Sequence, residues 1–245
     1  MASGKNKLWE RIGEIGILSL PGERGNYLHE PEFIPLEQLE GFFNEPGLKG
    51  VIIRGSGRHF SAGADLNRLS QLVKDEAVLS ENMTAGKKLI LLIENALFPV
   101  IAEISGACFG GGLEIALACH IRICSDNALF AFPEVNNGIM PGLGGTVLLP
   151  RVIGQGRAAE MILSGDIVNA EKALEIRLVD YVIPAKELHN FTLSYLQKLT
   201  NDRDTEVIRS VMQSINNAQT QSIVAATEAE TRLFCALAAR NMKDK

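Results

Sequence analysis

The sequence predicts an α/β fold with a helical carboxy-terminal region. Short apolar runs rich in β-branched residues alternate with amphipathic stretches of helical period. The resulting order of strand, helix, strand, helix and strand is typical of a sheet joined by crossover connections. From Arg157 onward the pattern is mainly helical. We therefore divide the chain into an α/β core over residues 1–190 and a helical region over residues 191–245.

The first elements follow from alternation and turn residues. Apolar residues alternate with polar ones over residues 8–20, a segment that ends at Pro21-Gly22 and predicts strands or a hairpin. Residues 25–35 have the composition of a loop. Residues 36–43 then gather their leucines and phenylalanines on one helical face, and Pro46-Gly47 close that helix.

The middle of the chain alternates buried strands with helices. The runs over residues 48–54, 99–104 and 121–124 are short, apolar and rich in β-branched residues, which suits buried strands. Between them, residues 66–95 have helical spacing, and a second helix begins at Gly110-Gly111-Gly112. This alternation carries the prediction of the α/β layer.

The last part of the chain is helical with one interruption. Residues 178–182 predict a strand before Pro184. Residues 204–242 are rich in alanine and amphipathic, so we expect helices there. One hypothesis for this extension is that it lies against a neighbouring subunit.

Composition and charge limit the classes of partner. The 245 residues carry a formal net charge of −5, which argues against a nucleic acid or an anionic membrane surface as the main partner. No apolar run reaches the roughly 18 residues of a membrane span, and the amino terminus lacks the apolar core of a secretory signal. We therefore expect a cytoplasmic protein. The four cysteines form no CxxC pair, which favours buried reduced thiols, and the four histidines lack metal-ligand spacing.

Three glycine-rich segments are candidate binding elements. In residues 59–65, small side chains let the backbone approach a ligand, although a tight turn with Asp65 as a helix N-cap explains them as well. Residues 105–114 place three glycines before a helix, whose free N–H groups suit a phosphate, a transient oxyanion or simple packing. Residues 132–146 follow Glu134 with a glycine-dense loop, which indicates either a pocket wall or an inert surface carboxylate.

Together these segments indicate acid–base chemistry. Glu114 lies near the start of a largely apolar helix, where burial raises the pKa of a carboxyl group. With Glu134 in the same pocket, one carboxyl group can act as an acid and the other as a base. Water addition needs such a pair, and two backbone N–H groups from different loops would hold the developing enolate oxygen.

Three sequence blocks resemble the enoyl-CoA hydratase (crotonase) superfamily, in order along the chain. They are HFSAGADL (59–66), ISGACFGGGLEIALACHIRICSDNALFAFPEV (104–135) and GIMPGLGGTVLLPRVIG (138–154), and the match continues over residues 158–184. The resemblance implies a crotonase-type spiral of ββα turns with a helical tail that serves for trimerisation. It also implies a homotrimer or hexamer, and an α,β-unsaturated acyl thioester as the substrate.

The resemblance assigns roles to residues of this chain. It implies that the N–H groups of Ala64 and Gly111 form an oxyanion hole. Glu114 would activate the water, and Glu134 would deliver the α-proton. The same blocks place five residues beside the substrate: Ala62, Asp65, Phe109, Gly110 and Gly142. The resemblance implies neither a metal nor a cofactor, because the acyl-CoA or acyl-phosphopantetheine thioester is itself the substrate.

The presence of both glutamates favours a hydratase or dehydratase of fatty acid metabolism. A Δ3-Δ2 enoyl-CoA isomerase needs only one working carboxylate, and a non-catalytic thioester-binding subunit needs neither. Residues 23–33 depart from the stretch that helps to bind coenzyme A in the superfamily, and Phe109 replaces a smaller residue. These departures keep open a dehydratase that acts on a branched acyl group held by an acyl carrier protein, as in polyketide biosynthesis.

Overall fold

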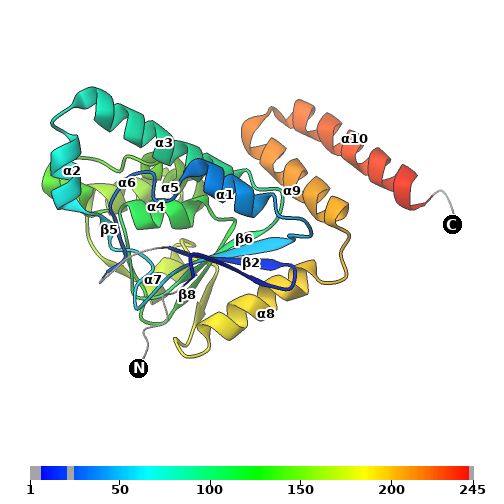
Figure 1. The fold of residues 1–245 in the computed structure, drawn as a ribbon, viewed down its shortest axis with the longest axis horizontal. Coiled ribbons are helices and arrows are strands. Elements are labelled where there is room, and N and C mark those ends of the chain that lie inside the picture. The colour runs from blue at the N-terminus through cyan, green and yellow to red at the C-terminus, as the bar shows by residue number, and fades with distance from the viewer. Residues whose placement is uncertain (1–6, 21–24, 243–245) are drawn as a thin grey trace.

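A central sheet of mainly parallel strands organises the protein (Figure 1). The computed structural model describes residues 7–20 and 25–242. Its large sheet consists of β1 Trp9–Ile12, β2 Ile15–Leu20, β4 Gly50–Gly55, β6 Val100–Ile104, β8 Ile121–Ser125 and β11 Tyr181–Ile183, side by side in that order. In this sheet β2, β4, β6, β8 and β11 run parallel to one another. β1 pairs antiparallel with β2 at one edge. The predicted α/β layer with crossovers is confirmed.

Shorter strands form a second series of pairs. They are β3 Tyr27–Leu28, β5 Gly63–Ala64, β7 Ala107–Phe109, β9 Leu129–Ala131 and β10 Val168–Asn169. β3 pairs with β5, and β9 lies between β7 and β10. A bridge between Ser61 and Cys108 joins the two groups. Strands β2, β4, β6 and β8 are thus each followed by a short strand and then by a helix, which gives the predicted spiral of ββα turns.

The side chains of the large sheet alternate between two apolar cores. Ile17, Ile52 and Ile101 belong to the core beneath helix α8 (Leu188–Thr200), which contributes Leu188 and Leu196. Residues that follow them in the strands, such as Leu18, Ile53 and Ala102, join the larger core on the other side. Figure 1 shows α8 on the opposite side of the sheet from the helices of the amino-terminal half. Burial on both faces explains why these strands are mostly apolar.

The helices of the amino-terminal half are α1 Leu36–Phe43, α2 Leu66–Leu72, α3 Glu76–Glu94 and α4 Gly111–Ala118. The single helix predicted over residues 66–95 is wrong, because the chain forms two helices there. Asp75 starts the second one, since its carboxylate accepts hydrogen bonds from the N–H groups of Ala77 and Val78. The resulting α2–α3 corner forms one wall of the site described below.

The segment that follows β9 is helical. It contains the 3-10 turn η1 Pro133–Asn137 and the helices α5 Gly145–Ile153, α6 Gln155–Ser164 and α7 Ala170–Glu175. The strand predicted over residues 178–182 exists as β11 but begins at Tyr181. Leu178 and Val179 are buried ahead of the strand, which explains the apolar pattern that predicted an earlier start.

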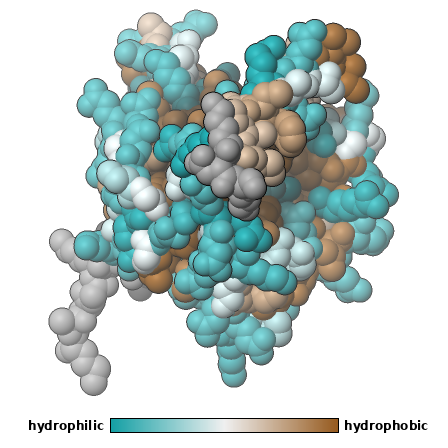
Figure 2. All heavy atoms as spheres, turned by 90° about the vertical axis from the view of Figure 1, so that its right-hand side faces the viewer, coloured by the Kyte–Doolittle hydropathy of each residue, from teal (hydrophilic) through white to brown (hydrophobic). Residues whose placement is uncertain are grey.

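The carboxy-terminal region forms two helices, α9 Thr205–Thr220 and α10 Ile223–Asn241. α9 buries Ile208 and Met212 in the larger core, whereas α10 packs against α9 at the periphery. Figure 2 looks onto this end of the molecule, where hydrophobic surface lies among hydrophilic side chains. On α10, Ile223 and Phe234 are exposed. The boundary placed at residue 190 falls within α8, which packs against the sheet.

Three of the cysteines are buried free thiols, as predicted: Cys108, Cys119 and Cys124. The prediction is wrong for Cys235, which is exposed on α10. In the described part of the chain, no helix has both the length and the apolar character needed to cross a membrane. The turn expected at Pro21-Gly22 lies outside the described residues.

Candidate active site

The first glycine-rich segment becomes the short strand β5 and the start of α2. Asp65 caps α2, because its Oδ1 accepts hydrogen bonds from the N–H groups of Asn67 (2.9 Å) and Arg68 (3.3 Å). Hydrogen bonds from the N–H groups of Arg68 and Asn67 lower the pKa of Asp65. Ala64, directly before this cap, lines the cavity described below. This segment therefore contains both the predicted helix N-cap, Asp65, and a residue that lines the cavity, Ala64.

Ser61 fixes the backbone ahead of Ala64. Its side chain is fully buried, and its Oγ donates to the carbonyl oxygen of Asn26 at 2.7 Å. The same Oγ accepts a hydrogen bond from the N–H of Gly63 at 3.2 Å. Asn26 is buried and in turn donates from Nδ2 to the carbonyl oxygen of His59 at 2.8 Å. These bonds hold the start of β5 against the loop before β3.

The second glycine-rich segment leads into α4. Gly110 has a φ of +49° and donates its N–H to the carbonyl oxygen of Ala131. A Cβ added to Gly110 would lie 2.6 Å from Oε1 of Glu134, so the carboxyl group occupies the space that a side chain would need. Gly111 is the first residue of α4, where the helix leaves N–H groups without an internal partner. That N–H group is available to an anion.

Glu114 is the buried carboxyl group of the site. Its side chain projects from the first turns of α4, and the residue is 2% exposed. Oε1 accepts hydrogen bonds from the N–H groups of Leu143 and Gly145, both at 2.7 Å. Burial raises the pKa of Glu114 from 4.5 to about 7, against the opposing effect of the Gly145 hydrogen bond and with a further increase from Glu134. Glu114 is therefore poised to exchange a proton near neutral pH.

Glu134 approaches the same space from η1. Burial raises the pKa of its carboxyl group as well. Oε2 is buried and has no hydrogen-bond partner among the described residues. Burial of a carboxyl oxygen without a hydrogen-bond partner lowers the stability of the fold. Such an oxygen is typical of a group that receives its hydrogen bond only when a ligand binds.

Two adjoining cavities meet at Glu134. The first, of about 250 Å³, is lined by both glutamates and by Ala64, Gly111 and Gly142. The second, of about 540 Å³, is lined by Ala62 and Gly110 among others. Both cavities share Glu134 and the segment of Ala64 and Asp65. Of the residues predicted from sequence, all but Phe109 therefore line this double cavity.

The backbone of Phe109 lies against β5. Its carbonyl oxygen lies against Gly63, where an added Cβ would approach it to 2.9 Å. Phe109 accordingly supports the β5 backbone and lines neither cavity. Among the described residues, no group of three or more histidine, cysteine, aspartate or glutamate side chains has the arrangement of a metal site.

The sequence profile of the enoyl-CoA hydratase/isomerase family matches residues 33–244, a range that contains the two carboxyl groups and both N–H groups. The chain belongs to this family. A solved enoyl-CoA hydratase of Bacillus anthracis supports the assignment. It superposes with a TM-score of 0.84 at 29% identity, over 93% of this chain and 90% of that one.

Curated members of the family match parts of the chain. A probable enoyl-CoA hydratase of Bacillus subtilis is 44% identical over 146 residues, which make up 59% of this chain and 54% of that protein. The fatty acid oxidation complex subunit alpha of Shewanella loihica is 41% identical over 172 residues, 68% of this chain and 24% of that protein. The matched part therefore spans about half or less of these curated relatives.

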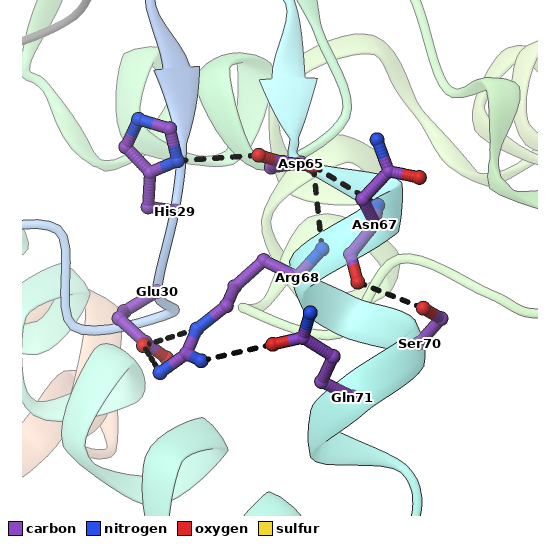
Figure 3. Close-up of polar contacts among 7 residues, drawn as sticks. All are labelled: His29, Glu30, Asp65, Asn67, Arg68, Ser70 and Gln71. Atoms are coloured by element: carbon purple, nitrogen blue, oxygen red, sulfur yellow. Dashed lines mark hydrogen bonds and ion pairs between the residues drawn. The ribbon is translucent and has the colours of Figure 1, made fainter.

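Apart from Asp65, the rim of the first cavity was not predicted from the sequence. Figure 3 shows two polar contacts across it, from the segment after β3 to α2. His29 Nδ1 lies 3.2 Å from Asp65 Oδ2, and the Arg68 guanidinium pairs with Glu30. Arg68 also donates to Gln71. A signal was available for the apolar wall behind this rim, because Leu69, Leu72, Leu79 and Met83 recur at helical spacing. No local pattern marked His29 or Glu30, because only folding brings them to Asp65 and Arg68.

Proposed function

We propose that this chain is an enoyl-CoA hydratase, which adds water to an α,β-unsaturated acyl thioester or removes it in the reverse direction. One observation carries the proposal: two carboxyl groups of raised pKa face one cavity together with the segments that bear two N–H donors. Similarity to the probable hydratase of Bacillus subtilis supports the same reaction.

The oxyanion hole would consist of the N–H groups of Ala64 and Gly111. Bound between them, the thioester carbonyl oxygen would accept both hydrogen bonds, and these bonds strengthen as negative charge develops. Each such donor contributes about 3–4 kcal/mol to transition-state stabilisation. The β and α carbons of the substrate would then lie beside Glu114 and Glu134.

Hydration moves two protons through the carboxyl pair. The ionised carboxylate, assigned to Glu114, takes a proton from water as the water oxygen bonds to the β-carbon. The C=C electrons shift to the thioester carbonyl, which becomes an enolate. The protonated carboxyl group, assigned to Glu134, gives its proton to the α-carbon as the carbonyl re-forms. One glutamate gains a proton and the other loses one, so the pair holds a single proton before and after the reaction. The proposed reaction is redox-neutral and uses no cofactor.

The acyl group and its carrier would occupy different cavities. We assign the cavity of about 540 Å³ to the phosphopantetheine arm, because Asn67 and Asn137 line it and offer amide groups to the amides of that arm. The arm belongs equally to coenzyme A and to an acyl carrier protein. Comparison of crotonyl-CoA with a crotonyl carrier protein, at equal concentrations, would identify the preferred carrier from the ratio of kcat/KM.

The test of the reaction uses crotonyl-CoA and the loss of the conjugated enoyl-thioester absorbance. Glu114→Gln and Glu134→Gln should each lower kcat by about 10²–10⁴-fold, the usual contribution of a positioned acid or base. Glu160→Gln is the matched control, because Glu160 is exposed on α6, away from both cavities. Wild-type activity on a 3-enoyl-CoA without hydration of crotonyl-CoA would instead establish the isomerase reaction. Absence of both activities would refute the proposal.

The assembly is proposed to be a homotrimer or a hexamer of such trimers. The exposed apolar side chains of α10, including Ile223 and Phe234, support burial of this helix against a second copy. The residues 191–245 would then act as the trimerisation region. Light scattering of the purified chain would decide between a monomer, a trimer and a hexamer.

A further inference from the structure

The two N–H groups assigned to the oxyanion hole belong to two different short sheets. Ala64 ends β5, which pairs with β3, whereas Gly111 follows shortly after β7, which pairs with β9. In the described part of the chain these two sheets share a single bridge, between Ser61 and Cys108, and no regular ladder. The spacing of the two N–H groups therefore depends on the contact between residues 58–61 and residues 105–109, which we call the junction.

The backbone pairing at the junction is irregular. The N–H groups of two successive residues, Phe60 and Ser61, both donate to the other segment. Their acceptors lie two residues apart, since they are the carbonyl oxygens of Ser105 at 2.8 Å and of Ala107 at 3.1 Å. Gly106 is the extra residue between these acceptors, and its φ of +54° is a conformation that glycine adopts at little cost. An extra residue of this kind interrupts the ladder and leaves a backbone group to be satisfied in another way.

The group left over is the N–H of Ala107, and the imidazole of His59 satisfies it. The N–H of Ala107 donates to Nδ1 of His59 at 2.9 Å. The carbonyl oxygen of His59, which would be the acceptor in a regular parallel ladder, instead accepts a hydrogen bond from Nδ2 of Asn26 at 2.8 Å. A Cβ added to Gly106 would lie 2.5 Å from the same Nδ1, so the ring packs directly against the extra residue. The His59 side chain thus occupies the irregular place in the junction.

The hydrogen bond of His59 is the shorter of two side-chain bonds that cross the junction among the described residues. In the other, Ser105 Oγ donates to the carbonyl oxygen of Arg58 at 3.3 Å in an exposed position. Ala107 is buried, so removal of the imidazole would leave a buried N–H group without an acceptor. Such a group is unfavourable, and the two segments would move relative to each other to relieve it.

Close contacts beyond the junction would carry such a movement to the site. A Cβ added to Gly63 would lie 2.9 Å from the carbonyl oxygen of Phe109, and a Cβ added to Gly112 would lie 2.6 Å from Cβ of Ser61. The segment that bears one N–H donor therefore touches the segment that bears the other along its length. A change of alignment at the junction would change the spacing of the two donors.

We propose that His59 is a positioning residue for the oxyanion hole, because its Nδ1 fixes the alignment of the two segments and with it the spacing of the Ala64 and Gly111 N–H groups. The inference rests on the proposed function, since it takes the thioester carbonyl oxygen to bind between these groups. His59 lines neither cavity, so it acts through the backbone and not on the substrate. Misaligned donors weaken the transition state, where the oxygen is charged, more than the ground state, so loss of His59 lowers kcat more than it raises KM.

The test compares His59→Asn with His59→Leu. Asparagine places an acceptor oxygen as many bonds from the backbone as Nδ1, whereas leucine places a methyl group of similar size there. His59→Leu should lower kcat for crotonyl-CoA by about 10–100-fold with KM changed less than about threefold, because a misplacement of about 1 Å can cost about 10²-fold. His59→Asn should restore most of this loss. Equal losses of kcat in both variants, or a rise in KM in place of the fall in kcat, would overturn the inference.

A second readout needs no turnover. Butyryl-CoA labelled with ¹³C at the thioester carbonyl is bound to each variant, and the infrared carbonyl stretch is recorded. Two hydrogen bonds should lower this frequency in the wild type and in His59→Asn, and the shift should be smaller in His59→Leu. Only bound ligand is shifted, so unfolded protein does not contribute. If wild-type chain shifts the band without hydrating crotonyl-CoA and His59→Leu loses the shift, the proposed function fails and the inference stands. Hydration by the wild type with an undiminished shift in His59→Leu overturns the inference alone, and no shift in the wild type overturns both.

Discussion

Replacement of Glu114 by glutamine should stabilise the fold at neutral and alkaline pH while it lowers kcat for hydration by about 10²–10⁴-fold. Burial raises the pKa of Glu114 from 4.5 to about 7. Between these two pH values the folded chain binds more protons than the unfolded chain, so ionisation of Glu114 lowers the free energy of unfolding as the pH rises. Glutamine stays neutral at every pH. Its side-chain oxygen can still accept the hydrogen bonds from Leu143 and Gly145.

The magnitude follows from the pKa shift. A difference of about 2.5 pK units corresponds to about 3 kcal/mol at 1.36 kcal/mol per unit. Glu114→Gln should therefore match the wild type near pH 4.5 and exceed it by up to about 3 kcal/mol at pH 8, or roughly 6–12 °C in Tm for a chain of this size. Urea denaturation across this pH range, at one protein concentration, measures the difference, with Glu160→Gln as the control. A difference that is constant with pH, or that favours the wild type more as the pH rises, would refute the reasoning.

Three further predictions concern the same site. The pH profile of kcat/KM should be bell-shaped with an alkaline limb near pH 7, because activity needs one proton on the pair and the last proton leaves at about that pH; a plateau to pH 9 would contradict it. Gly110→Ala should displace the carboxyl group of Glu134, since the new Cβ would lie 2.6 Å from Oε1, and should reduce kcat by about 10²-fold or more while the circular dichroism spectrum is retained. Ser61→Ala should cost about 1–3 kcal/mol in urea denaturation, because the carbonyl oxygen of Asn26 loses its 2.7 Å hydrogen bond. It should also lower kcat more than it raises KM, because Gly63, the neighbour of Ala64, loses its hydrogen bond to Ser61 Oγ; equal effects on both constants would argue against that positioning role.

The large sheet was predictable because most of its strands are short, mainly apolar segments rich in β-branched residues. Such strands can be recognised from the sequence, as can the helix that follows Gly110-Gly111-Gly112. The short strands such as β3 and β5 were not predictable, since two residues carry no period and their pairing depends on contacts across the fold. The two carboxyl groups were identified from their surroundings in the sequence and by resemblance to a family. Their distinct environments were not, because Leu143 and Gly145 reach Glu114 only after α5 has packed against α4.

Asn26 illustrates why part of the site could not be predicted from the sequence. It lies in a stretch that departs from the family pattern, yet it is buried at a φ of +49° and bonds to His59 and Ser61 at the start of the first glycine-rich segment. Asparagine tolerates positive φ better than most residues, which is a local signal. A single asparagine in a loop is too common for that signal to be specific.

The turn that holds Glu114 is also the wall that Met83 touches. Gly142 contacts the thioether, and Leu143 and Gly145, within three residues of it, supply the hydrogen bonds that oppose the rise in the Glu114 pKa. The shape of the cavity wall and the acidity of Glu114 therefore depend on the same short piece of backbone. A substitution that moves residues 142–145 would be expected to change both together.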